Sequence, residues 1–120
     1  MILITGHRGF IGRNLELFLR KTYPDIQGFD KKCGNDLTGD ISGLLEGVDV
    51  VIHLAAKTFV DHSIKDPECF INNNVLATFN LLEEARRYPV KKFIHISTDE
   101  VYGSINEGFY HEESKLNPGN

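Results

Sequence analysis

The sequence predicts an α/β fold, a Rossmann-like doubly wound parallel sheet in truncated form. Short apolar runs alternate with longer amphipathic stretches, which is the pattern of βαβ units with right-handed crossovers. A glycine-rich turn separates the first apolar run from the first amphipathic stretch, and residues 48–55 read VDVVIHLA, apolar enough for a strand buried on both faces. Periodicity alone would also allow an α/β domain of another topology.

The first half of the chain contains two expected strands and one expected helix. The strands lie at 2–4 and 26–29, and the helix lies at 10–22. One face of that helix carries apolar residues at helical spacing, namely Ile11, Leu15, Phe18 and Leu19. The polar, glycine-rich stretch 31–47 has room for a short strand and one helical turn.

The second half predicts two more strands, at 48–55 and 93–97, around a helix. Asp66, Pro67 and Glu68 form a typical helix start, with a capping residue, proline at the first position and an acid in the first turn. The expected core face of this helix at 67–88 consists of Ile71, Val75, Phe79, Leu82 and Ala85. Pro89 ends the helix, and the residues after Gly103 have loop composition.

Size, charge and composition suit one small domain. The chain has 120 residues, 41% hydrophobic and 25% charged, with a net charge of -4. This charge gives no electrostatic case for a nucleic-acid partner. No apolar run is long enough to cross a membrane, and no signal peptide is expected. Cys33 and Cys69 are expected to be free thiols in a cytoplasmic protein. The five histidines form no metal-ligand pair, so no metal site is expected.

Glycines at 6, 9 and 12 follow the first strand and open the first helix. Gly6 allows a sharp turn, Gly9 allows a pyrophosphate to approach the backbone, and Gly12 allows close packing of the helix. Asp30 ends the second strand 18 residues after Gly12, near the spacing of an acid that binds the adenosine ribose. The alternative is a strand-end acid without a ligand. The combination predicts a dinucleotide site.

Asp30 favours NAD over NADP, because its carboxylate repels a 2′-phosphate. Lys31 and Lys32 follow directly and weaken that preference, because they would attract such a phosphate.

With TGHRGFIG at 5–12 and IHLAA at 52–56, the sequence resembles the extended short-chain dehydrogenase/reductase family, the sugar-nucleotide epimerases and dehydratases. The helix Asn of that family, which supports the active-site geometry, matches Asn74. Asp36-Leu37 resembles the pair that contacts the adenine, and Asp40-Ile41 fits almost as well. The resemblance implies these cofactor-binding residues: Gly6, Gly9, Phe10, Ile11, Gly12, Asp30, Asp36, Leu37, Leu54, Ala55, Ala56, Thr58 and Asn74.

The segment ISTDEVYG at 96–103 is similar to nucleoside-diphosphate-glucose 4,6-dehydratases of the family, above all those acting on dTDP-glucose. By that resemblance, Thr98 would bind the sugar 4-hydroxyl, Asp99 would be the acid and Glu100 the base. NAD would take hydride from sugar carbon 4, water would then be eliminated, and hydride would return to carbon 6. Outside this context, Asp99 and Glu100 would be a solvated turn. An epimerase of the same family is a further alternative.

The family's Tyr-x-x-x-Lys pair does not follow this segment, because Tyr102 precedes Asn106 and Tyr110 precedes Ser114 at that spacing. We therefore expect residues 1–120 to be the N-terminal NAD(P)-binding domain of such an enzyme, without its substrate domain and inactive alone. The alternative is a catalytically silent dinucleotide-binding or interaction module. The expected partners are NAD, a nucleoside-diphosphate sugar, and a second copy in a homodimer, through apolar surface left on the helix at 67–88 or on the last strand.

Overall fold

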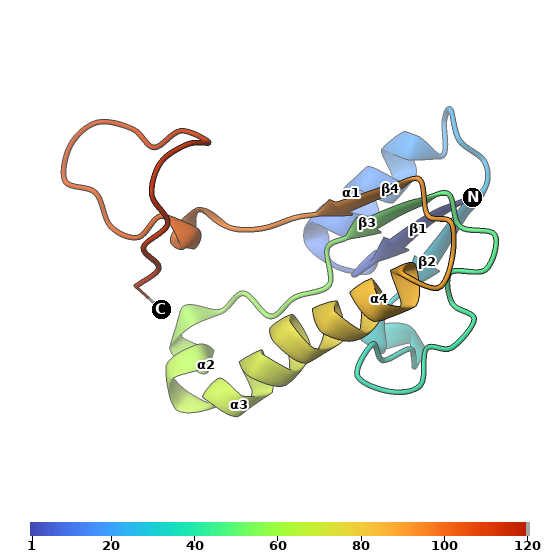
Figure 1. The fold of residues 1–120 in the computed structure, drawn as a ribbon, viewed down its shortest axis with the longest axis horizontal. Helices are drawn as coiled ribbons and strands as arrows, with labels where there is room; N and C mark the ends of the chain where they lie inside the picture. The colour runs from blue at the N-terminus through green and yellow to red at the C-terminus, as the bar shows by residue number, and fades with distance from the viewer. Residues whose placement is uncertain (120) are drawn as a thin grey trace.

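The computed structural model describes residues 1–119. A four-stranded parallel sheet lies at its centre in the order β2-β1-β3-β4 (Figure 1). The strands are β1 at Ile2–Thr5, β2 at Ile26–Phe29, β3 at Val50–His53 and β4 at Lys92–His95. Their pairing aligns Thr5 with His53, and His53 with His95. The strands therefore end together at one carboxyl edge of the sheet.

Helices cover both faces of this sheet, as Figure 1 shows. Helix α1 (Phe10–Leu19) packs on the cluster around Ile4, and helix α4 (Ala77–Ala85) packs on the cluster around Leu3. Leu3 and Ile4 are consecutive and fully buried, because neighbouring side chains of a strand point to opposite faces. The doubly wound arrangement expected from the sequence is confirmed.

The helical stretch from Asp66 to α4 is less regular than the sequence predicts. Helix α3 (Pro67–Phe70) begins as expected, with the Asp66 carboxylate accepting a hydrogen bond from the Cys69 N–H. A π-helical segment, η2 (Ile71–Leu76), then leads into α4. π-helical turns are rare and frequently occur at functional sites.

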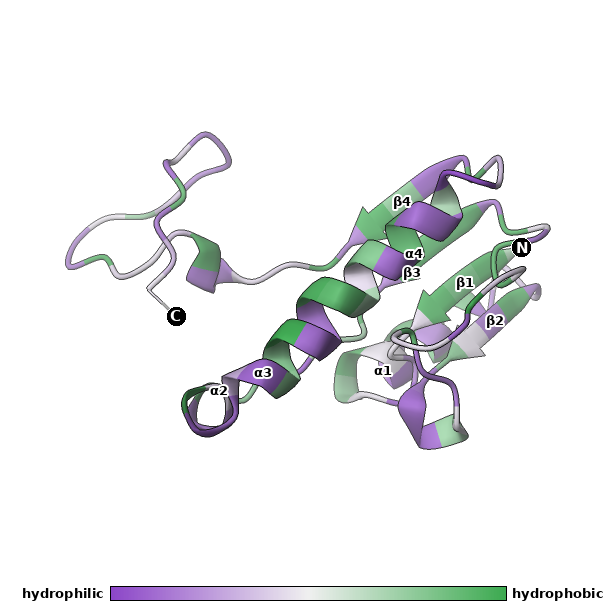
Figure 2. Cartoon of the chain, turned by 60° about the horizontal axis from the view of Figure 1, so that its bottom comes forward, coloured by the Kyte–Doolittle hydropathy of each residue, from purple (hydrophilic) through white to green (hydrophobic). Residues whose placement is uncertain are grey.

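The buried face of this stretch is not the predicted one. Ala77, Leu81 and Glu84 face the core. The predicted face is instead largely exposed: Ile71, Val75, Phe79 and Leu82 form an exposed hydrophobic stripe. Figure 2 shows hydrophobic (green) and hydrophilic (purple) residues alternating along this helical stretch. The physical reason is distance, because a small residue at 77 lets the helix approach the sheet closely, and the π-helical segment shifts the rotational phase of the residues before it.

Other sequence predictions also need correction. On α1, Leu15 and Leu19 pack on the core, whereas Ile11 and Phe18 are exposed. The stretch 31–47 forms no strand among the described residues; it begins with a 3₁₀ turn, η1 (Lys31–Cys33). Nevertheless, its apolar residues contribute to the core beneath α4, namely Leu37, Ile41 and Leu45.

The loop after β3 carries a short helix that the sequence did not indicate, α2 (Val60–Lys65). Strand β4 is the last in the sheet order, and Lys92 and His95 are exposed, so this strand is only partly buried. Cys33 and Cys69 are free thiols, as predicted. Among residues 1–119, no helix is long and apolar enough to cross a membrane.

Candidate cofactor-binding site

The chain leaves β1 through a turn at which only glycine fits. Gly6 has a φ of 70°, and a Cβ there would lie 2.7 Å from the backbone nitrogen of Ala55. Gly12 is equally confined, because a Cβ would lie 2.3 Å from the carbonyl oxygen of Gly6 and 2.7 Å from the Cα of His7. The tight turn expected at Gly6 and the close packing expected at Gly12 are thus both present. The backbone that Gly12 packs against is that of the turn, at Gly6 and His7.

Helix α1 opens directly from this turn without a side-chain cap. Gly9 is its N-cap residue, with extended backbone and no side-chain hydrogen bond. The first N–H groups of a helix have no intrahelical acceptor, and together with the helix dipole they attract anions. Phe10 and Ile11 flank this end with exposed side chains. The backbone here has the form that binds phosphate.

A groove of about 270 Å³ lies beside the turn, at the carboxyl edge of the sheet. Eight of the predicted cofactor residues line it: Gly6, Gly9, Asp30, Asp36, Leu37, Leu54, Ala55 and Ala56. The lining also contains Lys31 and Lys32, which the sequence placed beside a possible 2′-phosphate, and five residues that the sequence did not indicate: Phe29, Asn35, Lys57, Asn73 and Ala77. Only the assembled fold reveals these five, because they come from β2, η2, α4 and two loops.

Five predicted cofactor residues are not part of that lining. Phe10 and Ile11 begin α1 and Gly12 is buried in its first turn. Thr58 is exposed in the loop before α2, and Asn74 lies in η2. Between the two alternatives for the adenine, the geometry favours Asp36-Leu37: both line the groove, whereas Ile41 is a core residue and the Asp40 carboxylate binds Ser42.

Asp30 connects the glycine turn to η1. One of its carboxylate oxygens accepts the Arg8 N–H at 2.9 Å, and the other accepts the Lys32 N–H at 2.9 Å. The residue is 9% exposed and lines the groove. Because each carboxylate oxygen has two lone-pair directions, acceptor capacity is left for a ligand hydroxyl.

Lys31 and Lys32, which follow Asp30, differ in whether a nearby acid balances their charge. The Lys31 ammonium lies 3.0 Å from the Asp36 carboxylate and donates to the Asn73 side chain at 2.7 Å. Its charge is therefore balanced at the groove. Lys32 lines the same groove, so the positive charge expected to weaken a preference for NAD comes mainly from Lys32.

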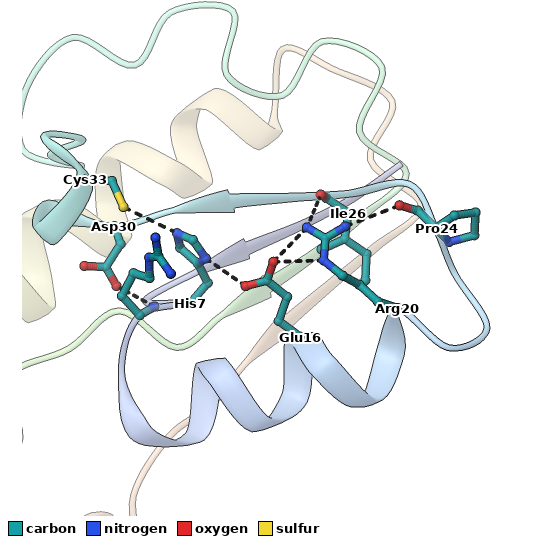
Figure 3. A network of polar contacts seen from close by, with 8 residues as sticks. His7, Glu16, Arg20, Pro24, Ile26, Asp30 and Cys33 are labelled. Atoms are coloured by element: carbon teal, nitrogen blue, oxygen red, sulfur yellow. Dashed lines mark hydrogen bonds and ion pairs between the residues drawn. The ribbon is translucent and has the colours of Figure 1, made fainter.

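His7 lies in the glycine turn and its side chain reaches Glu16 on α1, as Figure 3 shows. Its Nδ1 lies 2.9 Å from Glu16, which in turn pairs with Arg20 at 2.7 Å. Partial burial favours the neutral acid, but the hydrogen bonds from His7 and Arg20 outweigh it and lower the pKa of Glu16. The ring lies over Gly28, where a Cβ would come within 2.3 Å of Nδ1.

Asn74 fixes the loop after β3. Its side-chain oxygen accepts the Lys57 N–H at 2.8 Å, and its side-chain nitrogen donates to the Lys57 carbonyl at 2.8 Å. An amide that pairs with both backbone groups of one residue holds that residue in a single position. Asn74 therefore supports one wall of the groove, to which Ala55, Ala56 and Lys57 belong.

Thr98, Asp99 and Glu100 follow β4 at the same carboxyl edge of the sheet. Thr98 caps the 3₁₀ turn η3 (Asp99–Val101), and its hydroxyl oxygen accepts the Glu100 N–H at 3.2 Å. All three side chains are exposed. They are brought together locally, and none of them belongs to the groove lining.

A model of the NAD dependent epimerase/dehydratase family matches residues 2–120. The chain belongs to this family. Its resemblance to dehydratases is confirmed: the dTDP-glucose 4,6-dehydratase of Streptomyces niveus is 37% identical over 98% of this chain and 43% of its own length. The dTDP-D-glucose 4,6-dehydratase of Dictyostelium discoideum is 41% identical over 99% of this chain and 36% of its own length.

Solved structures agree with this family membership. DesIV, the dTDP-glucose 4,6-dehydratase of Streptomyces venezuelae with NAD and TYD bound, has a TM-score of 0.88 and 32% identity over 98% of this chain and 45% of that one. MoeE5 in complex with UDP-glucose and NAD has a TM-score of 0.89 and 29% identity, over 98% of this chain and 42% of that one. The chain thus spans less than half the length of these relatives. NAD, the cofactor expected from the sequence, is confirmed at the level of the family.

Tyr88 and Lys92 have the spacing of a Tyr-x-x-x-Lys pair, but they lie at the wrong edge of the sheet. Lys92 begins β4 and Tyr88 packs against the core beneath α4. Because all strands are parallel, the beginning of β4 is at the amino edge, opposite the glycine turn. These residues therefore belong to the structural scaffold and lie away from the glycine turn.

Proposed function

We propose that residues 1–120 are the NAD-binding part of a nucleotide-sugar 4,6-dehydratase or epimerase. The observation that supports this best is the glycine turn at the carboxyl edge, where confined Gly6 and Gly12 leave room only for backbone. The first N–H groups of α1 would bind the pyrophosphate, and Asp30 would accept hydrogen bonds from the adenosine ribose. Asp36 and Leu37 would contact the adenine.

When bound, NAD would accept a hydride from sugar carbon 4 and later return it. The proposed roles of this chain's residues follow from the resemblance of residues 96–103 to the family's dehydratases, and hydroxyl and carboxyl groups suit these roles. The Thr98 hydroxyl would hydrogen-bond the 4-hydroxyl of the sugar, Glu100 would take the proton from carbon 5, and Asp99 would protonate the leaving hydroxyl of carbon 6. An epimerase would share the cofactor site and the hydride step, and it would need no elimination.

We expect these 120 residues alone to release no dehydrated or epimerised sugar. No Tyr-x-x-x-Lys pair lies at the carboxyl edge within them, and loss of general-base catalysis slows such a step by about 10²–10⁴-fold. Product analysis with dTDP-glucose and NAD checks this expectation, and turnover at the rate of a complete enzyme would contradict it.

Calorimetric titration with NAD and with NADP tests the cofactor site. We expect NAD to bind more tightly than NADP. Asp30→Ala should weaken NAD binding by about 10–100-fold, because hydrogen bonds to a charged group contribute about 1.5–3 kcal/mol. The same change should reduce the preference for NAD, because it removes the charge that repels a 2′-phosphate.

Asp36→Ala and Asp40→Ala form a matched pair for the adenine contact. Both aspartates cap a local turn, at Thr38 and Ser42 respectively, but Asp36 alone of the two lines the groove. Asp36→Ala should weaken NAD binding, and Asp40→Ala should leave it unchanged. Equal effects of the two variants, or no saturable binding of NAD by the folded chain, would contradict the proposal.

A further inference from the structure

His53, at the end of β3, is a buried imidazole with a partner on each ring nitrogen. The residue is 1% exposed. Its Nδ1 lies 2.6 Å from the Thr5 hydroxyl oxygen, and its Nε2 lies 2.9 Å from the Thr78 hydroxyl oxygen. Thr5 ends β1 and Thr78 lies in the first turn of α4, so the ring joins two strands to a helix.

The neighbouring hydrogen bonds assign a direction to each bond of the relay formed by Thr5, His53 and Thr78. The Thr78 hydroxyl donates to the backbone carbonyl of Asn74 at 2.6 Å, so its oxygen accepts from His53 Nε2–H. On the other side, the Ala55 N–H donates to the Thr5 oxygen at 3.3 Å, and the Thr5 hydroxyl donates to Nδ1. A neutral imidazole with its proton on Nε2 satisfies both of these contacts, and we assign that tautomer to His53.

We propose that His53 is a positioning residue of the cofactor groove, acting through Thr78 on Asn74. The Thr78 hydroxyl fixes the Asn74 carbonyl within the π-helical segment, and the Asn74 side chain holds both backbone groups of Lys57. At its other end the relay ties the N–H of Ala55 to the end of β1. Ala55 and Lys57 both line the groove, so the relay sets the position of this wall. The inference rests on the proposed function, because it assigns His53 a part in NAD binding.

The surroundings of His53 keep the relay intact near neutral pH. Burial, followed by the charge of His95, lowers the pKa of His53 to about 4. Among the described residues, the titratable ring that packs beside His53 is His95 on β4, and the two ring centroids are 5.2 Å apart. The ring of Phe93 lies on the same strand, with its centroid 6.2 Å from that of His53. A proton on Nδ1 would abolish the bond from Thr5. The neutral ring stabilises the fold fully above the unfolded pKa of about 6.5, and this contribution falls as the pH drops towards 4.

His53→Gln and His53→Leu form the matched test. A glutamine can keep an N–H donor towards Thr78 and a carbonyl acceptor towards Thr5, whereas a leucine can keep neither. At a temperature where both are folded, we expect NAD binding to weaken about tenfold in His53→Leu, as for the loss of one buried hydrogen bond, and to recover largely in His53→Gln. Hydrogen exchange of the Lys57 amide should accelerate in His53→Leu while that of Leu3 stays slow.

Nitrogen NMR of the unaltered chain tests the proton assignment even if both variants fail to fold. We expect a protonated Nε2 and an unprotonated Nδ1 on His53 from pH 7 down to about 5. A proton on Nδ1 in this range, or a folded His53→Leu chain with unchanged Lys57 exchange and unchanged NAD affinity, would overturn the proposal. If the unaltered chain binds no NAD, the proposed function fails, but the exchange measurement still decides whether the relay holds Lys57.

Discussion

Gly6→Ala is expected to destabilise the domain by about 3 kcal/mol or more and to abolish NAD binding. Two costs add at this position. A residue with a Cβ loses about 1–2 kcal/mol in the left-handed conformation, and at Gly6 that Cβ would also lie 2.7 Å from the Ala55 nitrogen, a contact that the backbone of β1 and β3 must move to relieve. Urea denaturation measures the change in free energy of unfolding.

Gly43→Ala is the matched control for this substitution. Gly43 also has a positive φ, 82°, but a Cβ there would have no heavy atom within 4 Å. It should therefore show only the conformational cost of about 1–2 kcal/mol and keep NAD binding. Equal losses of stability in the two variants would contradict the close approach of the glycine turn to the loop after β3.

Leu81→Ala is expected to lower the free energy of unfolding by about 2–5 kcal/mol, the usual cost of truncating a buried leucine. Leu81 is 0% exposed on the buried face of α4, whereas its neighbour Leu82 is 44% exposed. Leu82→Ala should therefore cost below about 1 kcal/mol. Thermal unfolding of the two single variants provides the comparison. A larger loss at Leu82 would mean that the hydrophobic stripe, and not the Ala77–Leu81 face, packs on the sheet.

The turn and the strands could be predicted because their signals are local. Gly6 follows an apolar run, and Asp30 ends the next one, so one chain segment at a time determines them. The buried face of α4 could not be predicted in this way. Most of the large apolar side chains of this helical stretch lie on the exposed stripe, so a pattern of hydrophobic residues points to the wrong face. Ala77 lies in the core because the helix approaches Leu3 and Val51 closely, which the sequence of the helix alone does not reveal.

The core of residues 31–47 was missed for a related reason. Its glycines and aspartates indicate turns, and they do form turns, but Leu37, Ile41 and Leu45 recur every four residues and fill the space beneath α4. That spacing was the available signal. The buried Glu84 carboxylate, 3% exposed, then holds this segment by accepting the Gly43 N–H at 2.7 Å.

Part of the candidate site depends on the assembled sheet. The contact between His7 and Gly28 and the His53 relay to Asn74 each join segments that are 21 residues apart in the chain (28 − 7 and 74 − 53). No local pattern encodes these contacts. The homodimer expected from the sequence stays a prediction, with the exposed hydrophobic stripe on η2 and α4 as the surface it would use.

The most direct test of the central claim is to follow backbone amide NMR signals of the chain as NAD is added. The groove at the carboxyl edge predicts saturable changes at Gly6, Gly9, Asp30, Ala55 and Ala56. Asp66 and Glu68 line a neighbouring hollow and do not line the groove, so their signals should change little. Changes centred on that hollow, or no changes in a folded chain, would contradict the assignment of the glycine turn and its groove to NAD.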